Sequence, residues 1–178
     1  MEWREIQEAA AAALPFRCWI DTNAKDFQAV SDMPSEIVRY CQRTLQPVPQ
    51  EIGEFARCIL ESLSFTFRSV IDSLESVTGR DLRVIRLVGG GCLNECFCQM
   101  IADATHRVVV AGPVEATALG NVVLQAIATG HLNGMQAAKE ALKRSVKYKL
   151  FEPGPYDQWE EAYFRFSSLM SPATAVLS

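Results

Sequence analysis

Residues 82–104 read LRVIRLVGGGCLNECFCQMIADA, and this stretch decides the fold. Leu82–Val88 is a short apolar run rich in β-branched residues, which predicts a buried strand. Gly89–Gly91 end the strand, and an apolar periodic segment over Leu93–Ala104 predicts a helix. This order suits a nucleotide or phosphate cradle, because the amino end of a helix offers free N–H donors and partial positive charge. Such glycine turns as often simply connect a strand to a helix, so both interpretations stay open.

The composition predicts a globular protein of one domain or one and a half, with 178 residues and a 49% hydrophobic fraction for its core. The net charge is −4 and no cluster of Lys and Arg stands out, which argues against a nucleic-acid partner. The alanine run 9–13 follows three glutamates rather than the basic start of a secretory signal. No apolar segment is long enough to span a bilayer. We therefore expect a cytoplasmic protein with no nucleic-acid or membrane partner.

Six cysteines stand at positions 18, 41, 58, 92, 96 and 98. A chain of this length does not need a disulfide framework, so most of them are expected to be buried thiols. Cys92, Cys96 and Cys98 are clustered, but no second Cys or His cluster has ligand spacing, and we expect no metal site in this chain. Cys41 and Cys58 fall on consecutive predicted helices, which leaves a disulfide between them as a weaker hypothesis.

Apolar periodicity predicts three helices before the central stretch. They cover, in order, residues 2–13, residues 34–43 and a run of about 29 residues from position 52. Gly79 stands where a helix-ending glycine belongs. Alternating apolar residues at 16–20 predict a short strand. The carboxylate-rich stretch 21–34 could bind a cation, but a solvated loop is the commoner role of such residues and is favoured.

A second strand and further helices are expected after the central stretch. Val108–Ala111 is apolar throughout, which suits a sheet covered on both faces. A helix is expected from Glu115, and Ala116, Ala118 and Gly120 keep one side of it thin. Such a side permits tight packing on the sheet, which is slightly favoured, or the approach of a flat ring. The remaining expectations are a helix at 135–145, a last helix around Trp159 and a frayed tail at 171–178.

Two polar side chains of the central helix have undecided roles. Asn94 lies in its first turn, where an asparagine either caps its own helix or faces a ligand, and capping is the commoner role. Asp103 lies near its end, and the sequence does not decide between a structural role and exposure to solvent.

Taken together, these pieces resemble a known family. The run VGGGCLNECFCQMIADATHRVVVAGPVEATALGNVVLQAIATG, residues 88–130, resembles the nucleotide-binding half of the FGGY carbohydrate kinases, which have two actin-like domains. The resemblance extends upstream through DMPSEIVRYCQRTLQPVPQEIGEFARCILESL and downstream to YKLFEPGP. Within the family the chain is most similar to the rhamnulokinases. The implied fold is α/β, a partial actin-like (ribonuclease H-like) ATPase domain with a short mixed sheet flanked by helices, over 1–178 as a single domain.

The resemblance also implies which residues bind the nucleotide. Gly90 matches a position whose backbone contacts ATP, Gly89 and Gly91 shape the turn, and Asn94 matches a position that faces the adenine. Four residues of the GPVEATALGN run match the segment that supports this pocket: Glu115, Thr117, Gly120 and Asn121. The implied reaction transfers the γ-phosphate of ATP, with Mg²⁺, to L-rhamnulose and gives ADP and L-rhamnulose 1-phosphate. Positioning and charge neutralisation dominate such catalysis, with a base for the sugar hydroxyl.

The resemblance is incomplete, and the missing parts matter. The family keeps its phosphate-binding Asp-Gly-Thr loop, catalytic Asp and sugar contacts in the preceding half, and nothing in this chain matches them. We therefore expect no catalytic residue here, Mg²⁺ held mainly by the missing half and the phosphates, and no activity of this chain alone. The opening strands of an actin-like domain also have no match. An uncovered sheet edge would favour self-association into a dimer or larger species.

Three other functions compete with this interpretation. A fragment of another FGGY sugar kinase fits, because the residues that select the sugar are outside this chain. A truncated, non-catalytic binding module fits as well. A Rossmann oxidoreductase is disfavoured, because Gly89–Asn94 lacks the third spaced glycine of GxGxxG and no acidic ribose partner follows.

Overall fold

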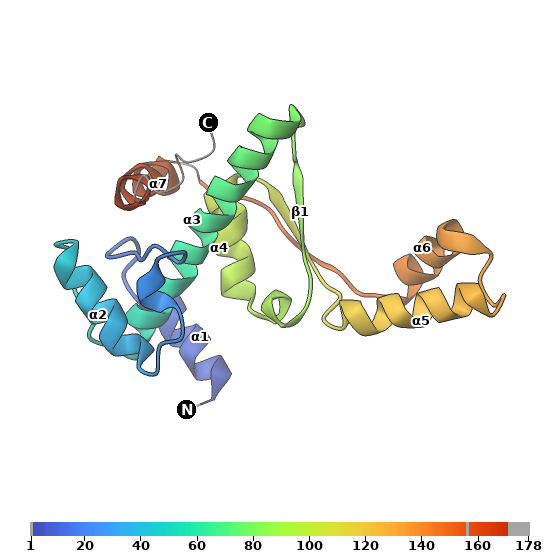
Figure 1. Cartoon of the computed structure of the whole chain (residues 1–178), viewed down its shortest axis with the longest axis horizontal. Coiled ribbons are helices and arrows are strands. Elements are labelled where there is room, and N and C mark those ends of the chain that lie inside the picture. The colour runs from blue at the N-terminus through green and yellow to red at the C-terminus, as the bar shows by residue number, and fades with distance from the viewer. Residues whose placement is uncertain (1, 156, 171–178) are drawn as a thin grey trace.

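The computed structural model describes residues 2–155 and 157–170, and the expected frayed tail lies outside them. Seven α-helices, two short 3-10 helices and three strands follow along this part of the chain (Figure 1). Their bounds are α1 Trp3–Ala12, η1 Lys25–Phe27, α2 Met33–Arg43, α3 Ile52–Thr78, β1 Val84–Leu87, η2 Gly90–Leu93, α4 Glu95–Thr105, β2 Val108–Ala111, α5 Ala116–Ala128, α6 Gly134–Ser145, β3 Lys149–Phe151 and α7 Asp157–Leu169. Within the described ranges, no helix is long and apolar enough to cross a membrane.

The three strands form one mixed sheet in the order β1-β2-β3. β1 and β2 are parallel, with Val84 opposite Val108, and β3 runs antiparallel to β2, with Phe151 opposite Val109. The strands expected within 82–88 and at 108–111 are both present. They are joined through α4, as parallel neighbours require a crossover connection.

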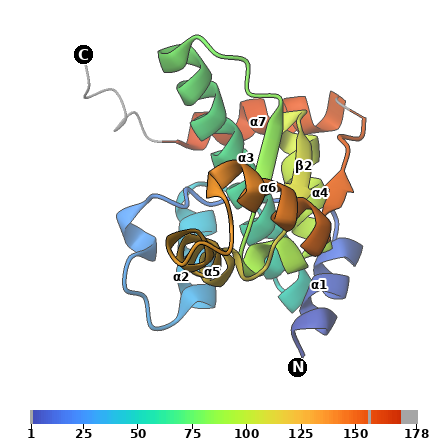
Figure 2. The ribbon, with the colours of Figure 1, turned by 90° about the vertical axis from the view of Figure 1, so that its right-hand side faces the viewer.

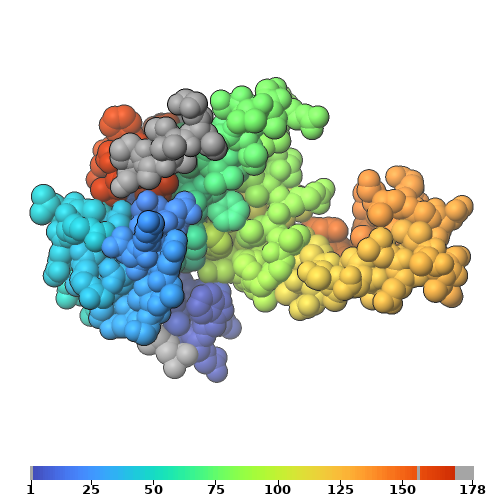
Figure 3. Space-filling view, viewed as in Figure 1, coloured from blue at the N-terminus to red at the C-terminus, as the bar shows by residue number. Residues whose placement is uncertain are grey.

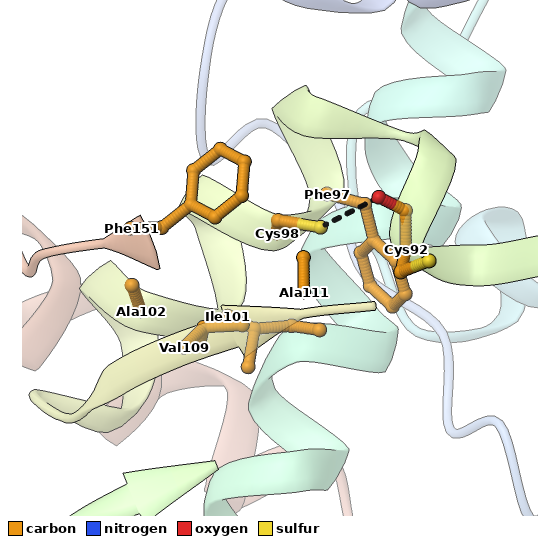
Figure 4. Packing of buried hydrophobic residues seen from close by; sticks show 8 residues of the cluster. All are labelled: Cys92, Phe97, Cys98, Ile101, Ala102, Val109, Ala111 and Phe151. Carbon is orange, nitrogen blue, oxygen red and sulfur yellow. Dashed lines mark hydrogen bonds between the residues drawn. The ribbon is translucent and has the colours of Figure 1, made fainter. Parts of the chain in front are cut away.

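Helices α3 and α4 cover one face of this sheet. The core on that face is drawn in Figure 4 and comprises Cys92, Phe97, Cys98, Ile101, Ala102, Val109, Ala111 and Phe151. The opposite face carries exposed side chains, since Val84 is 53% exposed and Leu150 is 64% exposed. Two expectations are therefore wrong: the strand before the glycines is not buried, and in the described residues the sheet is covered on one face only. Successive side chains of β1 point to opposite faces of the sheet, so those on the open face point away from the core.

Helix α3 is the long helix that the sequence predicts, and its 27 residues span about 40 Å. It ends where expected, at Gly79, which adopts φ 65° and donates its N–H to the carbonyl of Glu75 at 2.8 Å. Residues of α3 belong to all three hydrophobic clusters of the described chain. Helix α1 crosses α3 at Gly53, where a Cβ atom would lie 2.5 Å from the carbonyl oxygen of Ala9. This close crossing fixes α1 against the central helix.

The short strand expected at 16–20 is not formed. The N–H groups of this segment are bound by side chains instead of by a neighbouring strand: Glu61 accepts from Phe16, Gln46 accepts from Trp19 at 2.9 Å, and the Ser62 hydroxyl accepts from Ile20 at 2.9 Å. The alternation in the sequence was real, but it reflects burial of Cys18–Ile20 against α3.

The three aspartates of the 21–34 loop all bind groups of the protein itself. Asp21 accepts the N–H of Asn23, Asp26 pairs with Arg43 at 2.9 Å, and Asp32 caps α2 by accepting from Ser35. The Arg43 guanidinium lowers the pKa of Asp26. The structure thus agrees with the favoured interpretation of a surface loop.

All six cysteines are free thiols, five of them buried, as expected. Cys18, Cys41 and Cys58 meet in one hydrophobic cluster between the 18–20 segment, α2 and α3. Hydrogen bonds from the Cys18 and Cys58 thiols lower the pKa of Cys41. The proposed disulfide between Cys41 and Cys58 is not formed in the structure, and it stays a hypothesis that thiol counts before and after reduction would test.

Helices α5 and α6 stand away from the rest of the molecule and form an arm, residues 116–145 (Figures 1 and 3). Figure 2 looks at the molecule from the side of this arm. No residue of α5 is buried, and Ala138 is the only buried residue of α6. Tight packing of the thin side of α5 is not seen, because a Cβ atom on Gly120 would meet nothing within 4 Å.

Candidate functional site

Two turns meet at the carboxyl ends of the parallel strands. The Gly89 N–H donates to the carbonyl of Pro113 at 3.1 Å, and the Gly112 N–H donates to the carbonyl of Leu87 at 2.8 Å. The glycine turn after β1 is thus bound to the Gly-Pro turn after β2, as the motif order in the sequence suggests. Ligands of open α/β sheets bind outside this end of the strands.

The three glycines of the turn have different reasons to be glycine. Gly89 has φ 80°, a backbone conformation that other residues rarely adopt. Gly90 and Gly91 have no positive φ, they are exposed, and a Cβ atom on either would meet nothing within 4 Å. The fold of the described chain therefore does not require glycine at these two positions. A bare backbone there leaves room for a ligand to approach.

Asn94 caps helix α4. Its Oδ1 accepts the N–H of Phe97 at 3.0 Å, and only 4% of the residue is exposed. The helix expected from Leu93 consequently begins at Glu95, after the single 3-10 turn of η2. The cap fixes Oδ1 and orients the amide group, which borders a cavity.

That cavity has a volume of about 240 Å³ and lies between α1, α2 and α3, beside Asn94. Its lining is almost entirely apolar and comprises Trp3, Ile6, Gln7, Met33, Pro34, Ile37, Ile52, Phe55, Ala56, Ile59, Leu60 and Asn94. Gln7 and Asn94 are the two polar residues among them, and no charged side chain lines it. Binding sites for small organic ligands have this character, apolar walls with a few placed polar groups.

The sequence alone did not identify these walls. Ile52, Phe55 and Ile59 appear in it as part of the apolar stripe of a core helix. The stripe is wider than the core needs, because Ile52 remains 45% exposed. Only the crossing of α1, α2 and α3 shows that these side chains surround a space.

The residues expected to support the pocket lie on or next to α5. Glu115 precedes this helix without a side-chain capping bond, and Thr117, Gly120 and Asn121 are exposed. The structure therefore brings the glycine turn and Asn94 together at the start of α4, and it places Glu115 just before the arm and the other three residues on it. Their supporting role stays a prediction.

Asp103 has a structural role. Its Oδ1 accepts the N–H of Gly154 at 2.8 Å and the side-chain amide of Gln99 at 2.8 Å, which ties α4 to the segment after β3. Among the described residues, no group of three or more His, Cys, Asp or Glu side chains could hold a metal ion. The site thus consists of an apolar cavity and a bare backbone turn.

Comparison with known proteins identifies the family. Residues 1–129 match the C-terminal domain of the FGGY family of carbohydrate kinases. The chain is 35% identical over 164 residues to a rhamnulokinase of Bacteroides thetaiotaomicron, covering 92% of this chain and 34% of that protein. It is 39% identical over 138 residues to a rhamnulokinase of Halalkalibacterium halodurans, covering 78% of this chain and 30% of that protein. The chain thus spans about a third of the length of these curated relatives.

Solved structures agree on the fold. The crystal structure of Plasmodium falciparum glycerol kinase with ADP superposes with a TM-score of 0.63 at 19% identity, over 98% of this chain and 33% of that one. Xylulose kinase from Rhodospirillum rubrum gives a TM-score of 0.55 at 21% identity, over 72% of this chain and 26% of that one. The expected actin-like ATPase fold is confirmed. The chain belongs to the FGGY family of carbohydrate kinases and carries the C-terminal domain of that family.

Proposed function

We propose that this chain is the ATP-binding C-terminal part of a rhamnulokinase. The observation that carries the proposal is the apolar cavity that Asn94 borders, next to the glycine turn. An adenine ring would enter this cavity, and the ribose and phosphates would pass over Gly90 and Gly91. A Cβ atom at either glycine would point into open space, so the turn fits a ligand lying directly on its backbone.

Asn94 supplies the polar contact to the base in this proposal. Its Oδ1 is engaged by the Phe97 N–H, so the amide NH₂ is the group that can donate to a ring nitrogen. The apolar walls bury the flat faces of the ring and supply most of the binding free energy. The sequence resemblance, in which Asn94 matches a position that faces the adenine, supports the same orientation.

The phosphoryl transfer itself is assigned to residues outside this chain. The reaction proposed for the whole kinase is ATP and L-rhamnulose to ADP and L-rhamnulose 1-phosphate. In this proposal Mg²⁺ is held by the phosphates and by the preceding part of a kinase. This chain alone is then expected to bind ATP without transferring phosphate. Phosphorylation of L-rhamnulose by the purified chain would contradict the assignment of phosphoryl transfer to residues outside this chain.

A calorimetric titration with ATP tests the proposal directly. Saturable binding of one ATP per chain, competed by ADP and adenosine, is expected. Absence of binding up to millimolar ATP would favour the alternative of a non-catalytic module. ATP binding by this chain, together with phosphorylation of a different sugar once the preceding part of a kinase is added, would favour another FGGY sugar kinase.

Gly90→Val separates ligand approach from folding. A Cβ atom at this exposed position would meet no protein atom within 4 Å, so the free energy of unfolding should change by less than about 0.5 kcal/mol. The same side chain occupies the space proposed for the ribose and phosphates, and ATP affinity should fall about tenfold or more. Thermal unfolding and calorimetry on the same preparation measure both effects. Unchanged ATP affinity would remove Gly90 from the site.

The open edge of β1 predicts self-association, a second proposal about partners. Val84 is 53% exposed on this edge strand, and only β2 lies beside it among the described strands. Sedimentation should show a dimer or larger species, which Val84→Lys weakens by placing a charge on the edge. A wild-type chain that sediments as a monomer at all accessible concentrations would contradict the prediction.

A further inference from the structure

Another cleft, with a volume of about 380 Å³, lies where α1, α3, α4 and α7 come together. Its lining comprises Ala11, Pro15, Phe16, Arg57, Cys96, Gln99, Met100, Asp103, Gln158 and Trp159. It shares no lining residue with the cavity beside Asn94, and the glycine turn is not part of it. Pockets for small ligands have volumes of about 300–1,000 Å³, so this cleft is large enough for one.

Helix α4 turns a polar stripe toward this cleft. Cys96, Gln99 and Asp103 recur at spacings of three and four, which places them on one face of the helix. All three are half-buried, whereas Phe97 and Ile101 on the other side of α4 are buried in the core. Polar groups at half-buried positions need hydrogen-bond partners from the protein, from water or from a ligand.

Several polar atoms of the lining have hydrogen-bonding capacity left over. Oδ1 of Asp103 accepts from Gly154 and Gln99, but Oδ2 accepts from no residue that the structure describes. Arg57 uses Nε for Glu61 and Nη1 for three carbonyl oxygens, which leaves Nη2 as a donor. The side chain of Gln158 is exposed and makes no hydrogen bond within the described ranges. The cleft therefore offers donors and acceptors together.

The cleft also has an apolar wall. The rings of Phe16 and Trp159 meet edge to face, with centroids 4.9 Å apart and planes at 84°, and Met100 is buried beside Trp159 in the same cluster. This packing fixes the wall before any ligand binds. One rigid apolar surface next to several polar groups can recognise a molecule that has both kinds of surface.

The charges of the lining exclude an anion as the favoured ligand. The Arg57 guanidinium is already paired with the buried carboxylate of Glu61 at 2.8 Å. Burial raises the pKa of the Cys96 thiol, so this group stays neutral. Asp103 forms no ion pair with another described residue, and its negative charge would repel a phosphate or carboxylate in the cleft.

From these observations we infer that the cleft binds a neutral polyhydroxy compound of monosaccharide size, a sugar or a polyol. A hydroxyl group both donates and accepts, so it can bind Oδ2 of Asp103, Nη2 of Arg57 or the amide of Gln158. The C–H groups of the same molecule would lie on the wall formed by Phe16 and Trp159. This site is separate from the proposed nucleotide site and has no part in phosphoryl transfer.

The test is a calorimetric titration of the full chain with D-glucose, D-mannose and sorbitol, and with glucose 6-phosphate as the anionic comparison. No nucleotide is present, so the result does not depend on ATP binding. The variants are Gln158→Ala, which loses no hydrogen bond within the described chain, and Asp103→Asn, which keeps an oxygen for the Gly154 N–H. Gln42→Ala is the matched control, an exposed glutamine of α2 outside the cleft.

At least one of the neutral compounds should bind saturably, with one molecule per chain and at least fivefold tighter than glucose 6-phosphate. Gln158→Ala and Asp103→Asn should weaken this binding about fivefold or more, and Gln42→Ala should leave it within about twofold of wild type. Asp103→Asn should also reduce the discrimination against glucose 6-phosphate, because it removes the repelling charge.

Three outcomes would overturn the inference. The first is no saturable binding of any neutral compound at the highest soluble concentration. The second is equal binding by wild type, Gln158→Ala and Asp103→Asn, when thermal unfolding shows that both variants are folded. The third is displacement of the bound compound by adenosine, which would assign it to the cavity beside Asn94.

Discussion

Replacing Asn94 with aspartate is expected to keep the cap of helix α4 and to weaken ATP binding about tenfold or more. The aspartate retains an oxygen for the N–H of Phe97, and a carboxylate at the amino end of α4 is a good cap. It loses the amide NH₂, the group proposed to donate to the base, and brings a negative charge into an apolar cavity. Capping and base recognition are thereby separated at one residue.

Asn94→Ala completes the experiment. It removes the cap as well as the donor, so the free energy of unfolding should fall by about 1 kcal/mol and ATP affinity should fall as it does in Asn94→Asp. Denaturant unfolding and calorimetry measure the two quantities. If Asn94→Asp bound ATP as well as the wild type, Asn94 would be a helix cap only, and the cavity would need another polar contact.

Local signals in the sequence were sufficient for the elements that local forces determine. The 27 residues of α3 follow from apolar spacing of three and four, and its end follows from Gly79. The glycine turn and the start of α4 were recognisable for the same reason, since a cap and a positive φ are properties of a few consecutive residues. The resemblance to the family added the identity of the fold.

Other features depend on residues far apart in the sequence, and these the sequence did not determine. Residues 16–20 alternate like a strand, but side chains of α3 and Gln46 bind their N–H groups. The face of the sheet that carries Val84 is open because no described element packs on it, which no pattern within the strand encodes. The cavity arises where three helices cross, so its walls could not be distinguished from ordinary core positions.

The same reasoning explains why α5 was misjudged. Its small residues Ala116, Ala118 and Gly120 fit tight packing, and periodicity does not say which surface a helix packs on. The structure leaves that side without a neighbour in the described chain.

Removing the Glu61 carboxylate is expected to produce the largest loss of stability in this chain. Glu61 is 1% exposed, accepts the Phe16 N–H at 3.0 and 3.1 Å, and pairs with the Arg57 Nε at 2.8 Å. Arg57 also donates to the carbonyls of Ala10, Ala11 and Ala13, so one ion pair joins α3, the end of α1 and the segment that follows. Glu61→Ala leaves a buried guanidinium without its carboxylate and should lower the free energy of unfolding by about 3–5 kcal/mol.

The chain contains a matched control for this pair. Arg4 and Glu8 have the same spacing and an Nε–Oε1 distance of 2.9 Å, but their side chains are 85% and 66% exposed. Glu8→Ala should therefore change the free energy of unfolding by no more than about 0.5 kcal/mol. Denaturant unfolding measures both changes. Similar losses of unfolding free energy in Glu61→Ala and Glu8→Ala would show that burial does not make the Glu61 ion pair more important for stability.

The pH dependence gives an independent measure of the environment of Glu61. Burial raises the pKa of Glu61 above its ordinary value of 4.5, and Arg57 opposes this shift without cancelling it. Between the unfolded and folded pKa values the folded state holds the proton more often, so the contribution of Glu61 to stability falls as pH rises through that window. The non-titrating variant Glu61→Gln should therefore be most destabilised, relative to wild type, below the unfolded pKa. A difference that grows with rising pH instead would mean that attraction to Arg57 outweighs desolvation at this buried carboxylate.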